Sequence, residues 1–194
     1  AGNPEGLPAI CARLARHETV TRNLSVLYAG PSEQFTLTFD PRTVAGGALA
    51  DAPVARPAFL AIASLEELVQ ALAASDSLAP DGFIVEHHTA GGHNANPAGP
   101  MRKDVEGQPI YGQDDEPDLA IIKGVGIPFW LAGGYGSAAG FQAALAAGAV
   151  GVQVGSVFAL TEESGMKPEY RSAVFDKLRH GADDASLVKT TLFS

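Results

Sequence analysis

The stretch DGFIVEHHTAGGHN (Asp81–Asn94) joins a short apolar run to an exit rich in histidine and glycine. Residues 83–85 are predicted to be the centre of a buried parallel strand, because such strands are short apolar runs bounded by turn signals. Polar side chains crowd the exit of that strand: Glu86, His87, His88 and His93. In parallel α/β folds the reacting groups lie at the carboxyl ends of strands, so we expect this stretch to form one edge of an active site.

Strands and helices alternate four times from residue 59 onward. The predicted strands are FLAIA (59–63), FIVE (83–86), FWLA (129–132) and GVQV (151–154). The predicted helices span residues 65–75, 117–126, 137–148 and 170–180. This alternation implies parallel strands with right-handed crossovers, which defines an α/β fold class. Four such units could form an open sheet or half of an eight-stranded barrel.

The first third of the chain has a different pattern. A short helix is predicted over Pro4–His17, followed by a β-hairpin of LSVLY (24–28) and FTLTF (35–39). Residues 40–57 are rich in Ala, Gly and Pro and are predicted to be loop. We interpret residues 1–194 as a single domain with two additions, an inserted hairpin and loop at 20–57 and a long polar loop at 94–116.

Composition limits the classes of partner. The chain is 46% hydrophobic and carries a net charge of −9, which argues against nucleic acid or an anionic membrane as partner. It contains no apolar run of the ~18 residues that a membrane span needs, and its first residues lack the pattern of a signal peptide. A single cysteine, Cys11, excludes an intrachain disulfide, so we expect a cytoplasmic protein with Cys11 in the core.

Two small-residue turns follow the last two strands. Gly133-Gly134 and Gly155-Ser156 each stand between a strand and a helix, where backbone N–H groups can approach an anion. In barrels of this class a phosphate commonly binds after strands seven and eight. We therefore predict phosphate binding here, in preference to turns with no ligand. The stretch GGYGSAAG (133–140) lacks the acid that a dinucleotide site needs at the end of the next strand.

The histidines allow several roles. His93 follows two glycines, and a neutral imidazole suits proton abstraction near pH 7. Glu86, His87, His88 and His93 are metal-ligand residue types, but adjacent strand residues point to opposite faces, so we expect no metal site.

His17 and His180 are predicted to cap helix ends. Ser64 is predicted to cap the helix that follows it, with Glu67 completing a capping box. Motifs of hydrolases, P-loop enzymes and CxxC zinc sites are absent from the sequence.

Three stretches carry a resemblance to a known family: AGGHN (90–94), FWLAGGYGSAAGFQAALAAGAVGVQVGS (129–156) and FALTEESG (158–165). In order and spacing they resemble the nitronate monooxygenases, formerly called 2-nitropropane dioxygenases. AGNP (1–4) is similar to the segment after the fourth barrel strand of that family. The resemblance implies an FMN-dependent TIM barrel, of which this chain would supply strands five to eight, with the hairpin inserted before the fifth.

The resemblance also implies roles for single residues. The matching positions are catalytic His93 and cofactor-binding Gly91, Gly92, Gly133, Gly134, Gly155 and Ser156. His93 would take a proton from a nitroalkane close to the flavin. Gly91 and Gly92 would bring the histidine loop near the isoalloxazine ring, and the other four residues would cradle the FMN phosphate. Where the family has a glycine after the polar residue that ends this strand, His87 and His88 add bulk here, and their role stays open.

The implied reaction is the oxidation of alkyl nitronates with O2 to carbonyl compounds and nitrite. Two alternatives remain: an FMN-dependent reductase of enoyl thioesters that uses NAD(P)H, and a non-catalytic flavin- or phosphate-binding half-barrel. A half-barrel would leave two strand edges and one sheet face open. Exposing a few hundred Å2 of apolar surface costs ~10 kcal/mol, comparable with a domain's stability of ~5–15 kcal/mol. We therefore expect a missing N-terminal half or another chain to cover the gap.

Overall fold

Four short strands form a parallel sheet: β3 (Leu60–Ala63), β4 (Gly82–Glu86), β6 (Phe129–Ala132) and β7 (Gly151–Gln153). The computed structural model describes residues 6–24, 26–46, 48, 51–75, 79–182 and 189–192. The strands lie in the order β3-β4-β6-β7, which is their order along the chain. This is the arrangement that consecutive βα units adopt in a barrel. All four predicted strands are confirmed, each within two residues of its expected bounds.

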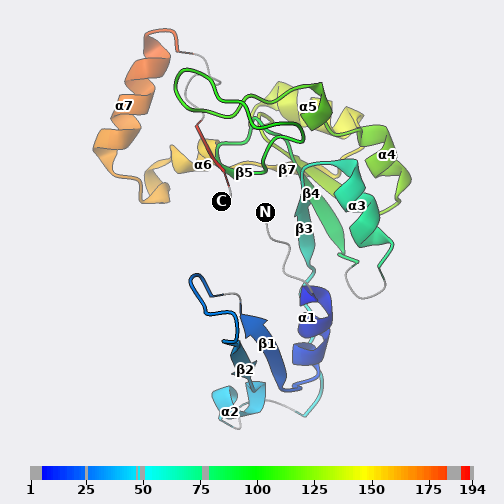
Figure 1. Cartoon of the computed structure of the whole chain (residues 1–194). Helices are drawn as coiled ribbons and strands as arrows, with labels where there is room; N and C mark the ends of the chain where they lie inside the picture. Colours follow the sequence, from blue (N-terminus) through cyan, green and yellow to red (C-terminus); the bar gives the residue numbers. More distant parts are fainter. Residues whose placement is uncertain are drawn as a thin grey trace.

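Three helices cover one face of the sheet: α3 (Glu66–Ala73), α4 (Leu119–Gly124) and α5 (Ala138–Ala146) (Figure 1). Alternate strand residues point to opposite faces, and the odd-numbered ones supply most of the core. The buried cluster consists of Ala61, Ala63, Val69, Phe83, Val85, Ile122, Phe129, Leu131, Ala144 and Ala149. The hydrophobic core therefore lies between the sheet and these three helices.

The other face of the sheet carries a row of half-buried side chains. Ile62 pairs in register with Ile84, Ile84 with Trp130, and Trp130 with Gly151. Ile62, Ile84 and Trp130 are each only partly buried. The Trp130 side chain lies against Gly151, where an added Cβ would come within 2.9 Å of Cδ1. This second face thus has packed side chains, but it keeps partial contact with solvent.

Side chains at the helix starts fix the crossovers. The Asp118 carboxylate accepts hydrogen bonds from the backbone N–H groups of Ala120 (2.9 Å) and Ile121 (3.1 Å). Ser137 Oγ accepts one from Gly140 N at 3.0 Å. The predicted Ser64 cap is wrong, because α3 begins after Leu65, which makes no side-chain cap. Glu66, in the first turn of α3, makes a different contact. Its carboxylate accepts a hydrogen bond from Asp118 N at 2.9 Å and joins the starts of α3 and α4.

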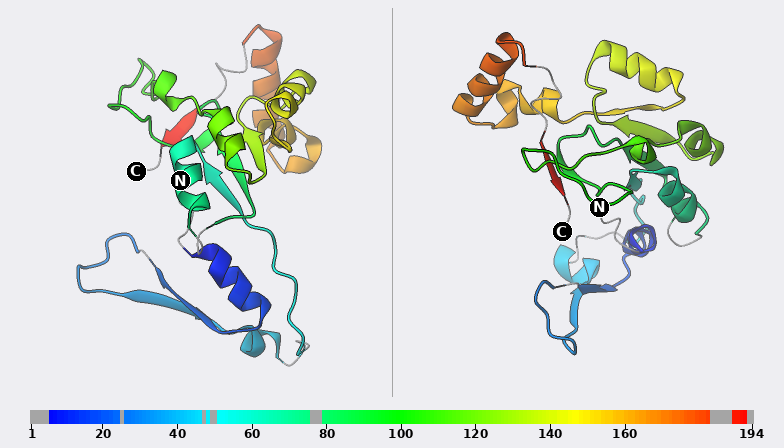
Figure 2. Two further views of the ribbon diagram at one scale, coloured as in Figure 1. Left: turned by 90° about the vertical axis from the view of Figure 1, so that its right-hand side faces the viewer. Right: turned by 45° about the horizontal axis from the view of Figure 1, so that its top comes forward.

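A separate lobe is formed by α1 (Leu7–Ala15), β1 (Val20–Leu24), β2 (Phe35–Phe39) and α2 (Pro41–Ala45), drawn in blue below the sheet in Figure 1 and at the bottom of both views in Figure 2. The predicted first hairpin strand is wrong, because β2 pairs with Val20–Leu24 and residues 26–28 lie in the connection. The prediction of loop over 40–57 missed α2, which Asp40 caps by accepting from Arg42 N at 3.0 Å.

The end of the chain supplies α6 (Ser156–Ala159), α7 (Pro168–Arg179) and β8 (Thr190–Leu192), which pairs in parallel with β5 (Gly92–Asn94). Two 3-10 turns, η1 (Gln113–Asp115) and η2 (Glu162–Ser164), lie in the connections. In Figures 1 and 2 this ribbon, α6 and α7 lie on the side of the sheet opposite α3–α5. Within the described residues, no helix combines the length and apolar character required to cross a membrane.

The predicted roles at the helix ends have mixed outcomes. His180 caps α7, since its Nδ1–H donates to the Asp176 carbonyl at 2.6 Å. The His17 prediction is wrong: its ring is buried, and neither nitrogen has a hydrogen-bond partner among the described residues. Cys11, which was predicted to lie in the core, is only half-buried on α1. The AGNP stretch (1–4) lies outside the described part of the chain.

Candidate functional site

The carboxyl ends of three neighbouring strands meet at one edge of the sheet. Glu86 at the end of β4 pairs in register with Ala132 at the end of β6, and Ala132 pairs with Gln153 at the end of β7. The histidine loop (residues 87–91) follows β4, one glycine turn follows β6, and Gly155 follows β7. The topology therefore brings three predicted site segments together, as the positions of their strands require.

The Gly133-Gly134 turn packs directly on the histidine loop. Both glycines have left-handed backbones, with φ of 93° and 75°. A Cβ on Gly133 would lie 2.9 Å from Ala90 N and 3.0 Å from the His87 carbonyl oxygen. Only glycine satisfies both the dihedral angle and the close approach of the two loops. The turn thus leaves Gly134 exposed at the sheet edge.

Gly155 and Ser156 are both exposed at the start of α6. An added Cβ on Gly155 would meet no atom within 4 Å, so packing by the described residues does not explain a glycine here. The space around this backbone is open. That is the property expected of a position where a ligand approaches the main chain.

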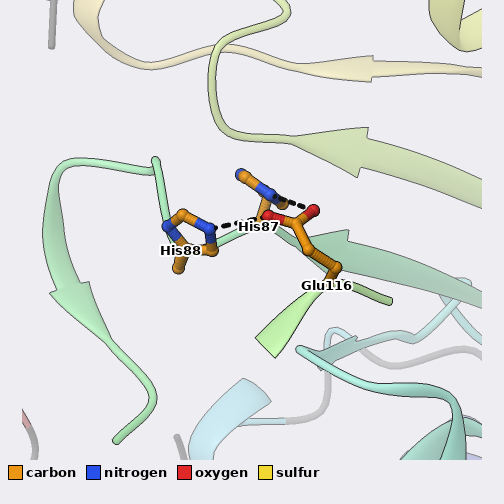
Figure 3. A group of neighbouring side chains, drawn as sticks. All are labelled: His87, His88 and Glu116. Carbon is orange, nitrogen blue, oxygen red and sulfur yellow. Dashed lines mark hydrogen bonds and ion pairs between the residues drawn. The ribbon is translucent and has the colours of Figure 1, made fainter. Parts of the chain in front are cut away.

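Two imidazoles and one carboxylate converge beside these turns (Figure 3). The Nε2 atom of His87 lies 2.8 Å from Glu116 Oε2, and Nε2 of His88 lies 2.9 Å from Glu116 Oε1. The two imidazole ring centroids are 4.0 Å apart. We call His87, His88 and Glu116 the His-His-Glu cluster. One carboxylate bridges both rings, and each of its oxygens contacts one ring.

The end of β4 at Glu86 explains how adjacent histidines reach the same carboxylate. The argument from opposite strand faces does not apply, because His87 and His88 stand in a turn rather than in a strand. His87 N donates to the Ala132 carbonyl, and Ala90 N donates to the His87 carbonyl, both at 2.9 Å. The turn rotates the second side chain toward the first.

Two residues that the sequence did not single out hold the histidine loop. The buried amide of Asn94 donates to the carbonyls of His88 (3.0 Å) and Ala90 (3.2 Å). Tyr111 stacks on the His88 ring with centroids 4.8 Å apart and donates its hydroxyl to the Ala95 carbonyl at 2.7 Å. The polar loop therefore supports the site through specific contacts.

Electrostatics separate the two glutamates at this edge. Hydrogen bonds from His88 and His87 lower the pKa of Glu116, which favours its carboxylate form. Burial raises the pKa of Glu86, whose half-buried side chain ends β4. Burial likewise raises the pKa of the Tyr111 hydroxyl. A carboxylate that favours its charged form and one that is more readily protonated thus lie in two different segments, at the end of β4 and before α4.

His93 lies outside the His-His-Glu cluster. It is the central residue of β5, with an exposed side chain, and its backbone pairs in register with Thr191 of β8. Gly92 N donates to the Lys189 carbonyl at 2.9 Å, and the Lys189 side chain forms an ion pair with Glu106. Loss of solvation lowers the pKa of His93, which favours the neutral imidazole. Gly91 is exposed just before this strand.

A family model described as nitronate monooxygenase matches residues 32–191. The match includes the histidine loop, both glycine turns, Glu116 and the first two residues of β8. No curated protein matches the chain.

Proposed function

Because the chain belongs to the nitronate monooxygenase family, we propose that it acts as an FMN-dependent oxidoreductase that oxidises alkyl nitronates with O2 to carbonyl compounds and nitrite. The observation that carries the proposal is the meeting of the histidine loop with the Gly133-Gly134 turn at the edge where Gly155 also lies. Backbone groups suited to an anion are thus held against the loop that leads directly into β5, the strand that carries His93.

The two glycine turns fit the phosphate of FMN. Gly134 and Gly155 expose their backbones at neighbouring strand ends, and the space beside Gly155 is open. The first turn leads into α5, a helix of nine residues whose N-terminus favours negative charge. Gly133, Gly134, Gly155 and Ser156 would hold the phosphate, and Gly91 and Gly92 would border the ring. FMN would supply the electron acceptor of the oxidation.

His93 is the proposed catalytic base. Its imidazole takes the proton from the carbon next to the nitro group, which converts a neutral nitroalkane into the nitronate. The lowered pKa of His93 keeps the ring neutral near pH 7 and therefore able to accept that proton. As pH falls through this lowered pKa, the ring becomes protonated, so turnover of neutral nitroalkanes decreases on the acid side.

We further propose that the sheet is one half of a (β/α) barrel, with strands corresponding to the fifth through eighth. The support is threefold: the strands follow one another in chain order, the helices cover one face, and the other face bears half-buried apolar residues. Preceding strands, from further sequence or from another chain, would complete the barrel wall. The O2-dependent reaction would then take place in the enclosed volume.

The test uses the purified chain, whose visible absorption spectrum first measures flavin occupancy. Nitrite release is then measured with a neutral nitroalkane and with its preformed nitronate. We expect His93→Ala to lose roughly 10²- to 10⁴-fold of the nitroalkane rate, with a smaller loss on the nitronate, which needs no proton removal. His180→Ala is the matched control, because His180 caps α7 away from this edge. Full activity of His93→Ala on the nitroalkane would exclude the base role.

The same sample distinguishes the alternatives. Oxidation of NAD(P)H that depends on an enoyl thioester, without nitrite release from nitronates, would identify a reductase. Stoichiometric flavin with neither activity would identify a non-catalytic binding module. A chain that takes up no FMN would contradict the proposed phosphate cradle.

A further inference from the structure

The His-His-Glu cluster presents three metal-ligand side chains at one point. Among the described residues, the ligand atoms of His87, His88 and Glu116 all lie within 4.8 Å of one another. We propose that this cluster binds a divalent transition metal ion of the Zn2+ class, through Nε2 of both histidines and the carboxylate of Glu116. Two imidazoles and one carboxylate form a ligand set found at zinc and non-haem iron sites.

The observed spacing suits such an ion. Nε2 of each histidine lies 2.8–2.9 Å from a carboxylate oxygen of Glu116. Ligand atoms about 2.0–2.2 Å from a tetrahedral zinc lie roughly 3.3–3.5 Å apart. The ligand atoms of the cluster lie within 4.8 Å of one another, so rotation of the side chains would bring them from the hydrogen-bonded arrangement into a coordination sphere.

The surroundings supply the second layer of contacts that metal-bound histidines use. Thr89 Oγ1 lies 2.7 Å from His87 Nδ1, where it can accept the Nδ1 proton and leave the Nε2 lone pair for the ion. The stacked ring of Tyr111 orients His88. Asn94 holds the loop that carries both histidines through its bonds to the carbonyls of His88 and Ala90. Each histidine thus has a neighbouring group that can orient its ring when the ion binds.

The cluster is also accessible. The side chains of His87 and His88 are 20% and 24% exposed, and that of Glu116 is 54% exposed. Three protein ligands leave a fourth position for water or for an oxygen atom of a small ligand. The proposal does not depend on flavin binding, because the ion uses side chains while the proposed phosphate cradle uses glycine backbones.

The first experiment needs no variant. The full chain with isotope-labelled histidines is titrated with Zn2+, and the side-chain nitrogen resonances are followed by NMR. We expect saturation at one ion per chain, with Nε2 shifts in two of the five histidines, His87 and His88. Shifts spread over all histidines, or no saturable change, would overturn the proposal.

Variants then assign the ligands through equilibrium dialysis with Zn2+. We expect His88→Ala and Glu116→Gln to weaken binding by at least the roughly 10- to 100-fold seen for second-layer changes, and Thr89→Val to weaken it by about 10-fold. His180→Ala is the control and should bind as the wild type does. Affinity should fall at acidic pH, since protonated imidazole does not coordinate. Equal affinity in the wild type, His88→Ala and Glu116→Gln would show a hydrogen-bonded cluster only.

Discussion

At the scale of single residues, Asp81 links the chain before β3 to the sheet. Its carboxylate accepts hydrogen bonds from Arg56 at 2.6 and 2.7 Å and from Phe59 N at 2.6 Å. The Arg56 guanidinium, together with this N–H group, lowers the pKa of Asp81 from 3.8 to about 2. Three donors on one carboxylate anchor the start of β3 beside β4.

This anchor predicts a pH-dependent stability. Because the folded pKa lies below the unfolded value, the contribution of Asp81 is full above pH 3.8 and is lost as pH falls through about 2. Asp81→Asn should reduce the free energy of unfolding at pH 7 by roughly 1 kcal/mol, since solvent screens this partly exposed pair. Urea denaturation followed by the fluorescence of Trp130 measures it.

The control for Asp81 is Asp51→Asn. The side chain of Asp51 is fully exposed, and its Oδ1 atom lies 3.7 Å from Arg42 Nη1. Replacing it should therefore leave the free energy of unfolding unchanged. A deficit of Asp81→Asn that kept its full pH 7 size below pH 2 would contradict the assignment.

The site residues differ in how visible they are from sequence. The residue types and strand-end positions of Gly133, Gly134, His87 and His88 were enough to predict that their loops meet at one edge of the sheet. Glu116 was not predicted, because its contacts with His87 and His88 span 29 and 28 residues of sequence. One signal was available: a residue just before a crossover helix lies at the same sheet edge as the end of the preceding strand.

At the scale of elements, the apolar strands of the sheet were predictable, whereas α2 and the first strand of the hairpin were not. The strands β3, β4, β6 and β7 are apolar runs. Such runs can be recognised from the sequence without knowledge of tertiary contacts. The five-residue α2 depends on the Asp40 cap and was hidden by its Ala- and Gly-rich setting. The first strand of the hairpin was misplaced because apolar residues 26–28 matched a strand pattern as well as Val20–Leu24 did.

The packing of β6 on β7 gives a prediction for this scale. Gly151→Ala should destabilise the fold by about 1–3 kcal/mol, because the new methyl group would press on Trp130 Cδ1 at 2.9 Å. Thermal or urea unfolding followed by circular dichroism measures the change. Gly124→Ala is the control: it lies in α4 with no atom within 4 Å of the new Cβ, so stability should rise by up to about 1 kcal/mol. Equal effects of both changes would contradict the packing argument.

At the scale of the whole molecule, many apolar side chains are exposed to solvent. β3 and β7 are the outer strands of the sheet, and each has one strand neighbour among the described residues. On the hairpin lobe, Phe35, Leu37 and Phe39 of β2 are 40%, 58% and 41% exposed. Exposed apolar surface next to unpaired strand edges favours association.

We therefore predict that the isolated chain associates with itself or with a covering partner. Sedimentation velocity should show species larger than one chain, in a proportion that increases with protein concentration. Leu37→Lys, on the exposed β2, should reduce that proportion if the hairpin lobe takes part. A single species with the mass of one chain at every concentration would show that the open face is tolerated without a partner.

The pairing of β5 with β8 has a consequence for the timing of biosynthesis. His93 pairs with Thr191, which leaves the ribosome about 100 residues later. At roughly 5–20 residues per second, that interval lasts about 5–20 s. After residue 156 has been made, the nascent chain contains both histidines of the cluster, Glu116 and both glycine turns, while the strand that fixes the backbone of His93 has not yet been made. Flavin or metal present at the ribosome can therefore meet the glycine turns and the cluster before β8 fixes the backbone of the proposed base.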